Sequence, residues 1–178
     1  MTTPVKKSLP LYPLVFLALL TSSLGFAAKA LAQAEVIPAV PKSYFNDYAH
    51  VVNQATSQKL NRQLAQFDRD TTIQVLVAIY PRMQSDALAK DYTMRVANKW
   101  GVGQKGRNNG VVLFLFTESH RLQIQTGSGL EAVLPDALCK QIIDERIIPH
   151  LRQGDFDGGL QAGVVAILAA IQIGTSRP

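Results

Sequence analysis

The sequence predicts an α/β protein in which helices cover both faces of a small mixed sheet. Two observations support this fold class. Segments with apolar residues at helical spacing alternate with short apolar runs rich in β-branched residues, in the order α-β-α-β-β-α-α. The chain also has 178 residues, of which 47% are hydrophobic. That composition is sufficient for the core of one principal domain.

The first 34 residues have the layout of a signal peptide. Lys6 and Lys7 precede an apolar run at residues 14–20, and two small-residue patterns suited to cleavage follow, ending at Ala32 and Ala34. An uncleaved membrane anchor is the alternative, but polar residues interrupt the apolar run well before the about 20 residues that a spanning helix needs. The predicted organisation is a signal peptide at residues 1–34, an extended lead at 35–44 and a single α/β domain at 45–174.

The leader also predicts where the protein works. It is short and lacks the long Ser- and Arg-rich region of a transit peptide, so we expect export to a bacterial periplasm. A cyanobacterial thylakoid lumen uses a similar signal and stays open as the alternative.

Charge and cysteine content exclude two classes of protein. The leader holds three of the 18 basic residues and no acidic one, which leaves 15 basic against 13 acidic residues, a net charge of +2. The remaining charges are mixed in sign, so no nucleic-acid partner is expected. The single cysteine, Cys139, cannot form an internal disulfide, and its apolar neighbours predict a small buried side chain rather than a nucleophile.

The first half of the domain contains a helix, a strand and a second helix. Residues 54–70 place Leu60, Leu64 and Phe67 at helical spacing after Asn53, a plausible N-cap. The run at 73–80 predicts a buried strand that Pro81 stops. A second helix is expected to start at Ser85 and Asp86, with an apolar stripe of Leu88, Tyr92, Val96 and Trp100.

The second half contains a β-hairpin and two helices. Residues 111–117 and 121–126 predict two strands joined by a three-residue connection, the first buried on both faces and the second more solvated. A helix that begins after Asp136 and runs to about Arg152 follows, in which Pro149 is expected to kink or tighten the end. The last helix, at 157–173, is apolar nearly all round. Its flanking glutamines leave it too short for a membrane span, so we expect it to pack in the core.

A glycine-rich loop at residues 101–110 raises the question of nucleotide binding. Gly101, Gly103 and Gly106 form a G-x-G-x-x-G pattern, but they follow a predicted helix and precede a predicted strand. A dinucleotide site needs the reverse order, because the N-terminus of the following helix holds the pyrophosphate. The P-loop spacing fails as well. We therefore expect no nucleotide, and we assign Gly101 to the end of the helix.

At this point the sequence resembles a known family, the TPM-domain proteins of bacterial envelopes and thylakoid lumens. Six blocks carry the resemblance, in the family's order and across the whole mature domain: Phe45-Asn46-Asp47-Tyr48-Ala49; Trp100-Gly101-Val102-Gly103 with Arg107-Asn108-Asn109-Gly110-Val111; Arg121 with Gly127-Ser128-Gly129; Leu134-Pro135-Asp136; Ile148-Pro149-His150; and Gly154-Asp155-Phe156-Asp157-Gly158-Gly159.

The resemblance implies a three-layer α/β/α sandwich, in agreement with the predicted element order. It also implies divalent-cation binding, as in some members, and acid phosphatase activity, as in the plant lumenal member. Roles in photosystem II repair or envelope maintenance suggest an envelope or membrane-associated protein as partner. Many bacterial relatives carry a C-terminal membrane helix, whereas this chain ends soon after its last domain helix, so no C-terminal membrane anchor is expected.

Four residues are the candidate metal ligands: Asp47, Asn108, Asn109 and Asp136. They are short, oxygen-bearing side chains in loops or at element ends, and a hard cation such as Ca²⁺ needs six to eight oxygen ligands. We expect them to converge on one rim. Each has a structural alternative: an Asx turn for Asp47, turn chemistry for Asn108 and Asn109, and a helix cap for Asp136.

Three function classes follow. The first is an exported accessory protein that binds a divalent cation, Ca²⁺ foremost, and a protein partner. The second is a metal-dependent acid phosphatase, with Asp47 and Asp136 as candidate catalytic residues and Lys105 or Arg107 as an assisting positive group. The third is an inert structural module.

The Asp155-Phe156-Asp157-Gly158 segment does not qualify as an EF-hand, because Ala166 stands where the loop needs its bidentate glutamate.

Overall fold

The computed structural model describes residues 35–176, so the predicted signal peptide lies outside the described residues. One four-stranded sheet organises this part of the chain, in the order β1-β2-β3-β4. Its strands are β1 (Phe45–Asp47), β2 (Gln74–Tyr80), β3 (Gly110–Phe116) and β4 (Arg121–Thr126). The first three are parallel, and β4 pairs antiparallel with β3. The sheet is therefore mixed, as predicted.

Strand β1 corrects the predicted order of elements. Residues 45–47 were expected only to follow an extended lead, but they pair with Val77, Ala78 and Ile79 of β2. Three residues are too few to show an alternating pattern. The strand exists because the chain before α3 runs alongside β2, a partner about 30 residues further on.

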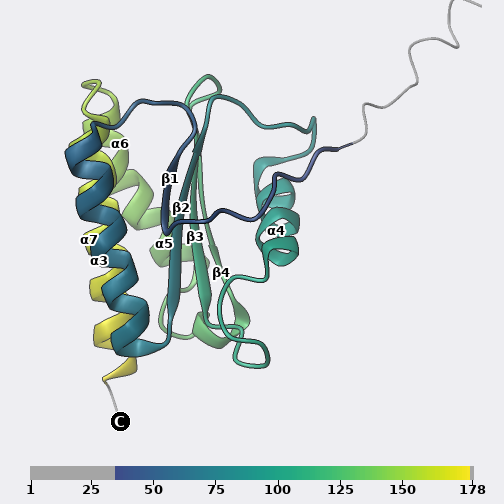
Figure 1. Cartoon of the computed structure of the whole chain (residues 1–178), viewed down its shortest axis with the longest axis vertical. Helices are drawn as coiled ribbons and strands as arrows, with labels where there is room; N and C mark the ends of the chain where they lie inside the picture. Colours follow the sequence, from purple (N-terminus) through teal and green to yellow (C-terminus); the bar gives the residue numbers. More distant parts are fainter. Residues whose placement is uncertain (1–34, 177–178) are drawn as a thin grey trace, which may run out of the picture. The chain divides into compact units, whose positions relative to one another are not determined.

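Helices cover both faces of the sheet and give the predicted three-layer sandwich (Figure 1). On one face α3 (Gln54–Thr71), α5 (Asp136–Ile142) and α7 (Phe156–Thr175) bury the odd-numbered residues of β2 and β3. On the other face α4 (Ala89–Trp100) packs on the even-numbered ones, among them Phe114. This alternation follows from the two-residue period of a strand. Because β3 is central, all seven of its residues are buried.

Helix α3 forms as its sequence predicts. Leu60, Leu64 and Phe67 are buried on the face that meets the sheet. The helix begins after Asn53, whose side-chain oxygen accepts a hydrogen bond from the Thr56 amide at 2.8 Å. That contact satisfies one of the free N–H groups of the first turn.

Helix α4 begins later than predicted. The expected start was Ser85, but the helix begins at Ala89, and Leu88 is 70% exposed instead of belonging to the buried stripe. Ser85 has other partners: its hydroxyl donates to the Glu35 carboxylate at 2.7 Å and accepts from the Ala87 amide at 3.1 Å. These contacts hold residues 85–87 in a turn. Tyr92, Val96 and Trp100 are buried as predicted.

The helix predicted to follow Asp136 and run to Arg152 is divided into α5, a π-helical segment called η2 (Ile143–Ile147) and α6 (Ile148–Leu151). Pro149 explains the division, because it has no N–H to donate to the carbonyl four residues earlier. The helix widens by one residue instead of tightening.

The last helix, α7, is longer than predicted at both ends. It begins at Phe156 after the N-cap Asp155, whose side chain accepts a hydrogen bond from the Gly158 amide at 2.8 Å. This bond, followed by one from His150, lowers the pKa of the Asp155 carboxyl. Leu160, Val164 and Ile167 are fully buried in the core. By length and composition alone, α7 with its 20 residues is long and apolar enough to cross a membrane, and 39% of its 18-residue apolar window is buried.

Candidate functional site

The glycine-rich loop between α4 and β3 folds back tightly on itself. Gly101 ends α4 in the left-handed conformation, and its amide donates to Ala97 and Asn98 carbonyls, as predicted for a C-terminal glycine. A Cβ on Gly110 would lie 2.1 Å from the Val102 carbonyl oxygen, and one on Gly103 would lie 2.5 Å from the Gly110 amide nitrogen. Only glycine permits this approach of backbone to backbone.

Asn109 holds the loop in place. Its side-chain oxygen accepts from the Gln104 amide, and its side-chain nitrogen donates to the Thr72 carbonyl, both at 2.7 Å. The residue is only 7% exposed. Both ends of the Asn109 side-chain amide are thus used to join the loop to the turn before β2. Asn109 therefore has the turn role that the sequence analysis gave as the alternative to metal binding.

A second pair of glycines packs against the backbone of the same glycine-rich loop. Gly127 and Gly129 follow β4, and a Cβ on either would lie within 2.1 Å of a carbonyl oxygen of Arg107 or Asn108. Asn108 adopts a positive φ of 47° and donates from its side chain to the Ser128 hydroxyl at 3.2 Å. The predicted blocks around residues 101–111 and 127–129 therefore form one structure.

A polar cleft of about 760 Å³ opens beside these loops. It lies at the start of β3 and the end of β4, between α4 and the N-terminus of α5. Two carboxylates, Glu131 and Asp136, line it together with the amide of Asn108 and the ammonium groups of Lys90 and Lys105. The cleft thus brings two of the four predicted ligands together.

Asp136 has a partner that the sequence analysis did not foresee. It is the first residue of α5 and makes no cap bond to the helix backbone. Instead, its Oδ2 atom accepts from Nζ of Lys90 at 2.6 Å. This hydrogen bond raises the pKa of the Lys90 ammonium group. The predicted cap role is replaced by an ion pair between two helices.

Asp47 lies at the other end of the sheet. It is level with Ile79 near the end of β2, whereas the Asn108-Asn109 pair precedes the start of β3. Six residues of strand separate the two levels, about 20 Å at 3.3 Å per residue. The Asp47 carboxylate accepts from the Ala49 and Val52 amides at 3.1 and 2.8 Å, the predicted Asx turn. The expected convergence of all four residues on one rim is therefore not met.

Positive groups of the loop point in different directions. Lys105 lines the cleft, whereas Arg107 donates to the Thr72 hydroxyl at 3.3 Å. Glu131 and Lys90 are cleft residues that the sequence analysis missed. The signal for Glu131 was its place just after Gly127-Ser128-Gly129, whereas nothing local singled out Lys90.

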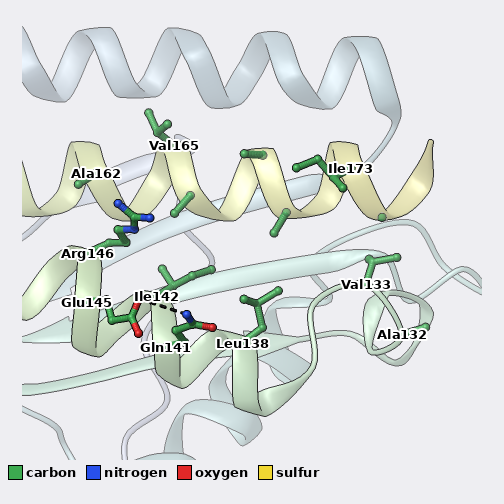
Figure 2. Close-up of a pocket in the computed structure, with 14 residues that line it drawn as sticks. Ala132, Val133, Leu138, Gln141, Ile142, Glu145, Arg146, Ala162, Val165 and Ile173 are labelled. Atoms are coloured by element: carbon green, nitrogen blue, oxygen red, sulfur yellow. Dashed lines mark hydrogen bonds between the residues drawn. The ribbon is translucent and has the colours of Figure 1, made fainter. Parts of the chain in front are cut away.

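A second hollow, of about 820 Å³, has a different character. Figure 2 shows it between α7, which supplies Ala162 and Ile173, and α5, which supplies Leu138 and Ile142. Its walls are mainly apolar, and none of the four predicted ligands lines it. Cys139 is buried nearby in the core, and this burial raises the pKa of its thiol, consistent with an inert side chain.

Within residues 35–176 no group of three or more His, Cys, Asp or Glu side chains is close enough to hold a metal ion. Any cation in the polar cleft would have to combine its two carboxylates with amide, hydroxyl and backbone oxygens. Such mixed oxygen sets are ordinary ligands for Ca²⁺. The donor chemistry therefore fits a hard cation and does not fit a zinc site built from His and Cys.

These features define a class: a single α/β/α sandwich domain with a polar cleft rimmed by close-packed glycine loops. The sequence model of the TPM domain matches residues 45–170, well over half of the chain. The protein belongs to the TPM-domain family.

Solved structures agree with this assignment. The N-terminal domain of a P. gingivalis protein is 34% identical, with a TM-score of 0.67, and the match covers 73% of this chain and 82% of that one. The BA42 protein of the psychrophilic bacterium Bizionia argentinensis is 16% identical, with a TM-score of 0.58 and 71% and 86% covered. The N-terminal domain of cg2496 from Corynebacterium glutamicum is also 16% identical, with a TM-score of 0.56 and 79% and 86% covered. The last two show the fold alone. A search of curated proteins gave no match.

Proposed function

We propose that this protein is an exported accessory domain that binds a divalent cation, Ca²⁺ foremost, in the polar cleft and binds a protein partner in envelope maintenance. One observation carries the cation proposal: Glu131, Asp136 and Asn108, all oxygen-bearing, line one cleft. The carboxylates supply charge, and the loop backbone supplies neutral oxygens. Asp47 is left out of this site, because the length of the sheet separates it from the cleft.

In the absence of a cation, one carboxylate of the cleft is paired with a lysine. Lys90 neutralises Asp136 through the 2.6 Å contact between their side chains. Both side chains are largely exposed, so the ion pair is weak and a divalent cation competes with it readily. Cation binding would separate the Lys90 ammonium group from Asp136 and leave the Asp136 carboxylate free to bind the cation.

The test is the thermal midpoint of residues 35–178 in chelator and in excess Ca²⁺, Mg²⁺ or Zn²⁺. A cation that binds only the folded state raises the midpoint. We expect a rise with Ca²⁺ that Glu131→Gln and Asp136→Asn each reduce and that their combination removes. Asp47→Asn is the matched control, since it changes a carboxylate to an amide at the other end of the sheet. A rise that depends on Asp47 but not on Asp136, or no rise with any cation, would reject the proposed site.

Metal-dependent phosphatase activity is the second candidate. The observation in its favour is that Lys105 lines the same cleft as the two carboxylates, where it would attract a phosphate group. Turnover of p-nitrophenyl phosphate tests it. We expect turnover that chelator abolishes and that Lys105→Gln and Asp136→Asn reduce, with Arg107→Gln as the matched control. Cation binding without turnover would leave the accessory role, and neither property would leave the inert structural module.

A further inference from the structure

We propose that the open edge of strand β4 binds an extended peptide segment of a partner protein, which adds a fifth strand to the sheet. This inference deepens the proposed partner role by naming the place and the form of the contact. It does not depend on the cation site, so the two can fail separately.

The backbone of β4 has one side without partners among the described residues. The strand pairs only with β3, and the Gly127 amide donates to the Gly110 carbonyl at 2.8 Å. In an antiparallel pair the residues that bond the neighbour alternate along the strand. Counting back from Gly127, the N–H and C=O groups of Gln125 and Gln123 face β3. Those of Leu122 and Ile124 therefore point outward, to the open edge.

A hollow of about 330 Å³ lies along this part of the edge. Leu122 and Gln123 form its floor. One wall is Ala89 at the start of α4, and the other is Ile143 with Ile148 on the opposite side of the sheet. A strand laid against β4 would place successive side chains against these two walls in turn. The hollow thus borders the outward backbone groups of β4 and has a wall on each side of the place where an added strand would lie.

The charge of the hollow indicates the kind of segment that fits. Its charged or titratable lining residues are Arg121 and His120, and no acidic side chain lines it. Arg121 is exposed at the first position of β4, so in an antiparallel complex it faces the C-terminal end of the bound segment. The preferred occupant is therefore an extended segment with β-branched residues that ends in a carboxylate side chain.

At the C-terminal end of β4, an ion pair between two helices blocks the open edge. Lys90 of α4 and Asp136 of α5 form their ion pair beside the end of β4, where the Gln125 side chain also donates to the Lys90 carbonyl at 3.1 Å. Because the two helices lie on opposite faces of the sheet, this pair closes the margin there. The bound segment is confined to the stretch from Arg121 to Ile124.

Two synthetic heptapeptides test the proposal, acetyl-Thr-Val-Thr-Val-Thr-Val-Glu-amide and the same peptide with Lys in place of Glu. The protein, expressed from the full-length sequence and labelled with ¹⁵N, is titrated with each peptide. We expect the Leu122 and Ile124 amide resonances to shift and their hydrogen exchange to slow with the Glu peptide. The Lys peptide should bind about fivefold more weakly.

Variants separate strand addition from other contacts. Leu122→Pro removes an outward N–H while leaving the bonds to β3, so we expect it to abolish binding, whereas Leu122→Val should keep it. Arg121→Glu should reverse the preference between the two peptides. That reversal requires a folded protein, so it also controls for unfolding.

Unchanged Leu122 and Ile124 amides with both peptides would overturn the proposal. So would binding that Leu122→Pro leaves intact. Slow exchange of these amides that depends on protein concentration and that peptide cannot displace would instead assign the edge to a second copy of the chain, which also overturns it. A failed peptide titration beside a Ca²⁺-dependent midpoint would leave the cation proposal standing.

Discussion

Lys90 and Asp136 join two helices that lie on opposite faces of the sheet, with 2.6 Å between Nζ and Oδ2. Their contact closes the sheet margin beside the end of β4, and both residues line the polar cleft. One ion pair therefore borders the two regions to which we assign function, the cleft and the open strand edge.

Replacing Lys90 should strengthen cation binding. In Lys90→Gln the competing ammonium group is gone, and Asp136 keeps its full charge for the cation. We expect about fivefold higher Ca²⁺ affinity, the magnitude of one exposed ion pair, measured by calorimetric titration. Lys59→Gln is the matched control. Lys59 is an exposed lysine whose ammonium group donates to the Gln161 side chain and does not line the cleft, so its replacement should leave the affinity unchanged. Weaker binding in Lys90→Gln would contradict the competition.

Asn109 should matter more for stability than its neighbour. Asn109→Ala removes a buried side chain and leaves its two part-buried hydrogen bonds, to the Gln104 amide and the Thr72 carbonyl, unmade, which costs about 1–3 kcal/mol in the free energy of unfolding. Asn108→Gly keeps the positive φ and loses only an exposed hydrogen bond, so it should change stability by less than about 0.5 kcal/mol. Urea denaturation measures both. Equal effects at the two positions would show that the Asn109 amide does not organise the loop.

Gly110 should not tolerate a side chain. A Cβ there meets the Val102 carbonyl oxygen at 2.1 Å, and this oxygen belongs to the backbone, which cannot move aside as a flexible side chain can. We expect Gly110→Ala to cost about 3 kcal/mol or more, or to prevent folding. Gly106→Ala has open space around it but a φ of 85°, so its cost should be about 1–2 kcal/mol. Purified yield and thermal midpoint compare the two variants. Equal losses in both would show that the Gly110 and Val102 backbones do not lie as close together as described.

The contact of Glu35 with Arg95 should appear in the pH dependence of stability. Hydrogen bonds from Arg95 and Ser85 lower the pKa of the Glu35 carboxyl from 4.5 to about 2. A carboxyl with a lowered folded-state pKa stabilises the fold above its unfolded pKa. This contribution is therefore present above about pH 4.5 and is lost as the pH falls toward 2.

Glu35→Gln should remove this component. We expect the wild-type protein to be more stable than the variant at pH 6, and the difference to shrink at pH 3, in urea titrations at the two values. Arg95→Gln should lose the same pH-dependent part, since it removes the main partner. If the difference in the free energy of unfolding between wild type and variant stays constant from pH 6 to pH 3, hydrogen bonds do not lower the pKa of Glu35.

Much of the fold could be predicted because its signals are local. The stripe of Leu60, Leu64 and Phe67 specifies α3, and a run of apolar residues specifies β3, whatever the rest of the chain does. Gly101 ends α4 because the left-handed conformation is a property of that one residue. Amphipathic period, caps and turns depend on neighbours within a few positions, so the sequence alone determined them.

Other features were decided by contacts between distant segments. Strand β1 needs β2 beside it, and α4 starts late because Ser85 is bound by Glu35, 50 residues away. Asp47 and Asp136 look alike as short acids at element ends, but the parallel register of β1 and β2 puts Asp47 at the far end of the sheet. Lys90 carried no local signal, and only packing of α4 on the opposite face brought it to Asp136. The sequence alone therefore determined the family and most of the elements, whereas strand register and helix placement decided which side chains share a site, because those depend on the packing of the whole domain.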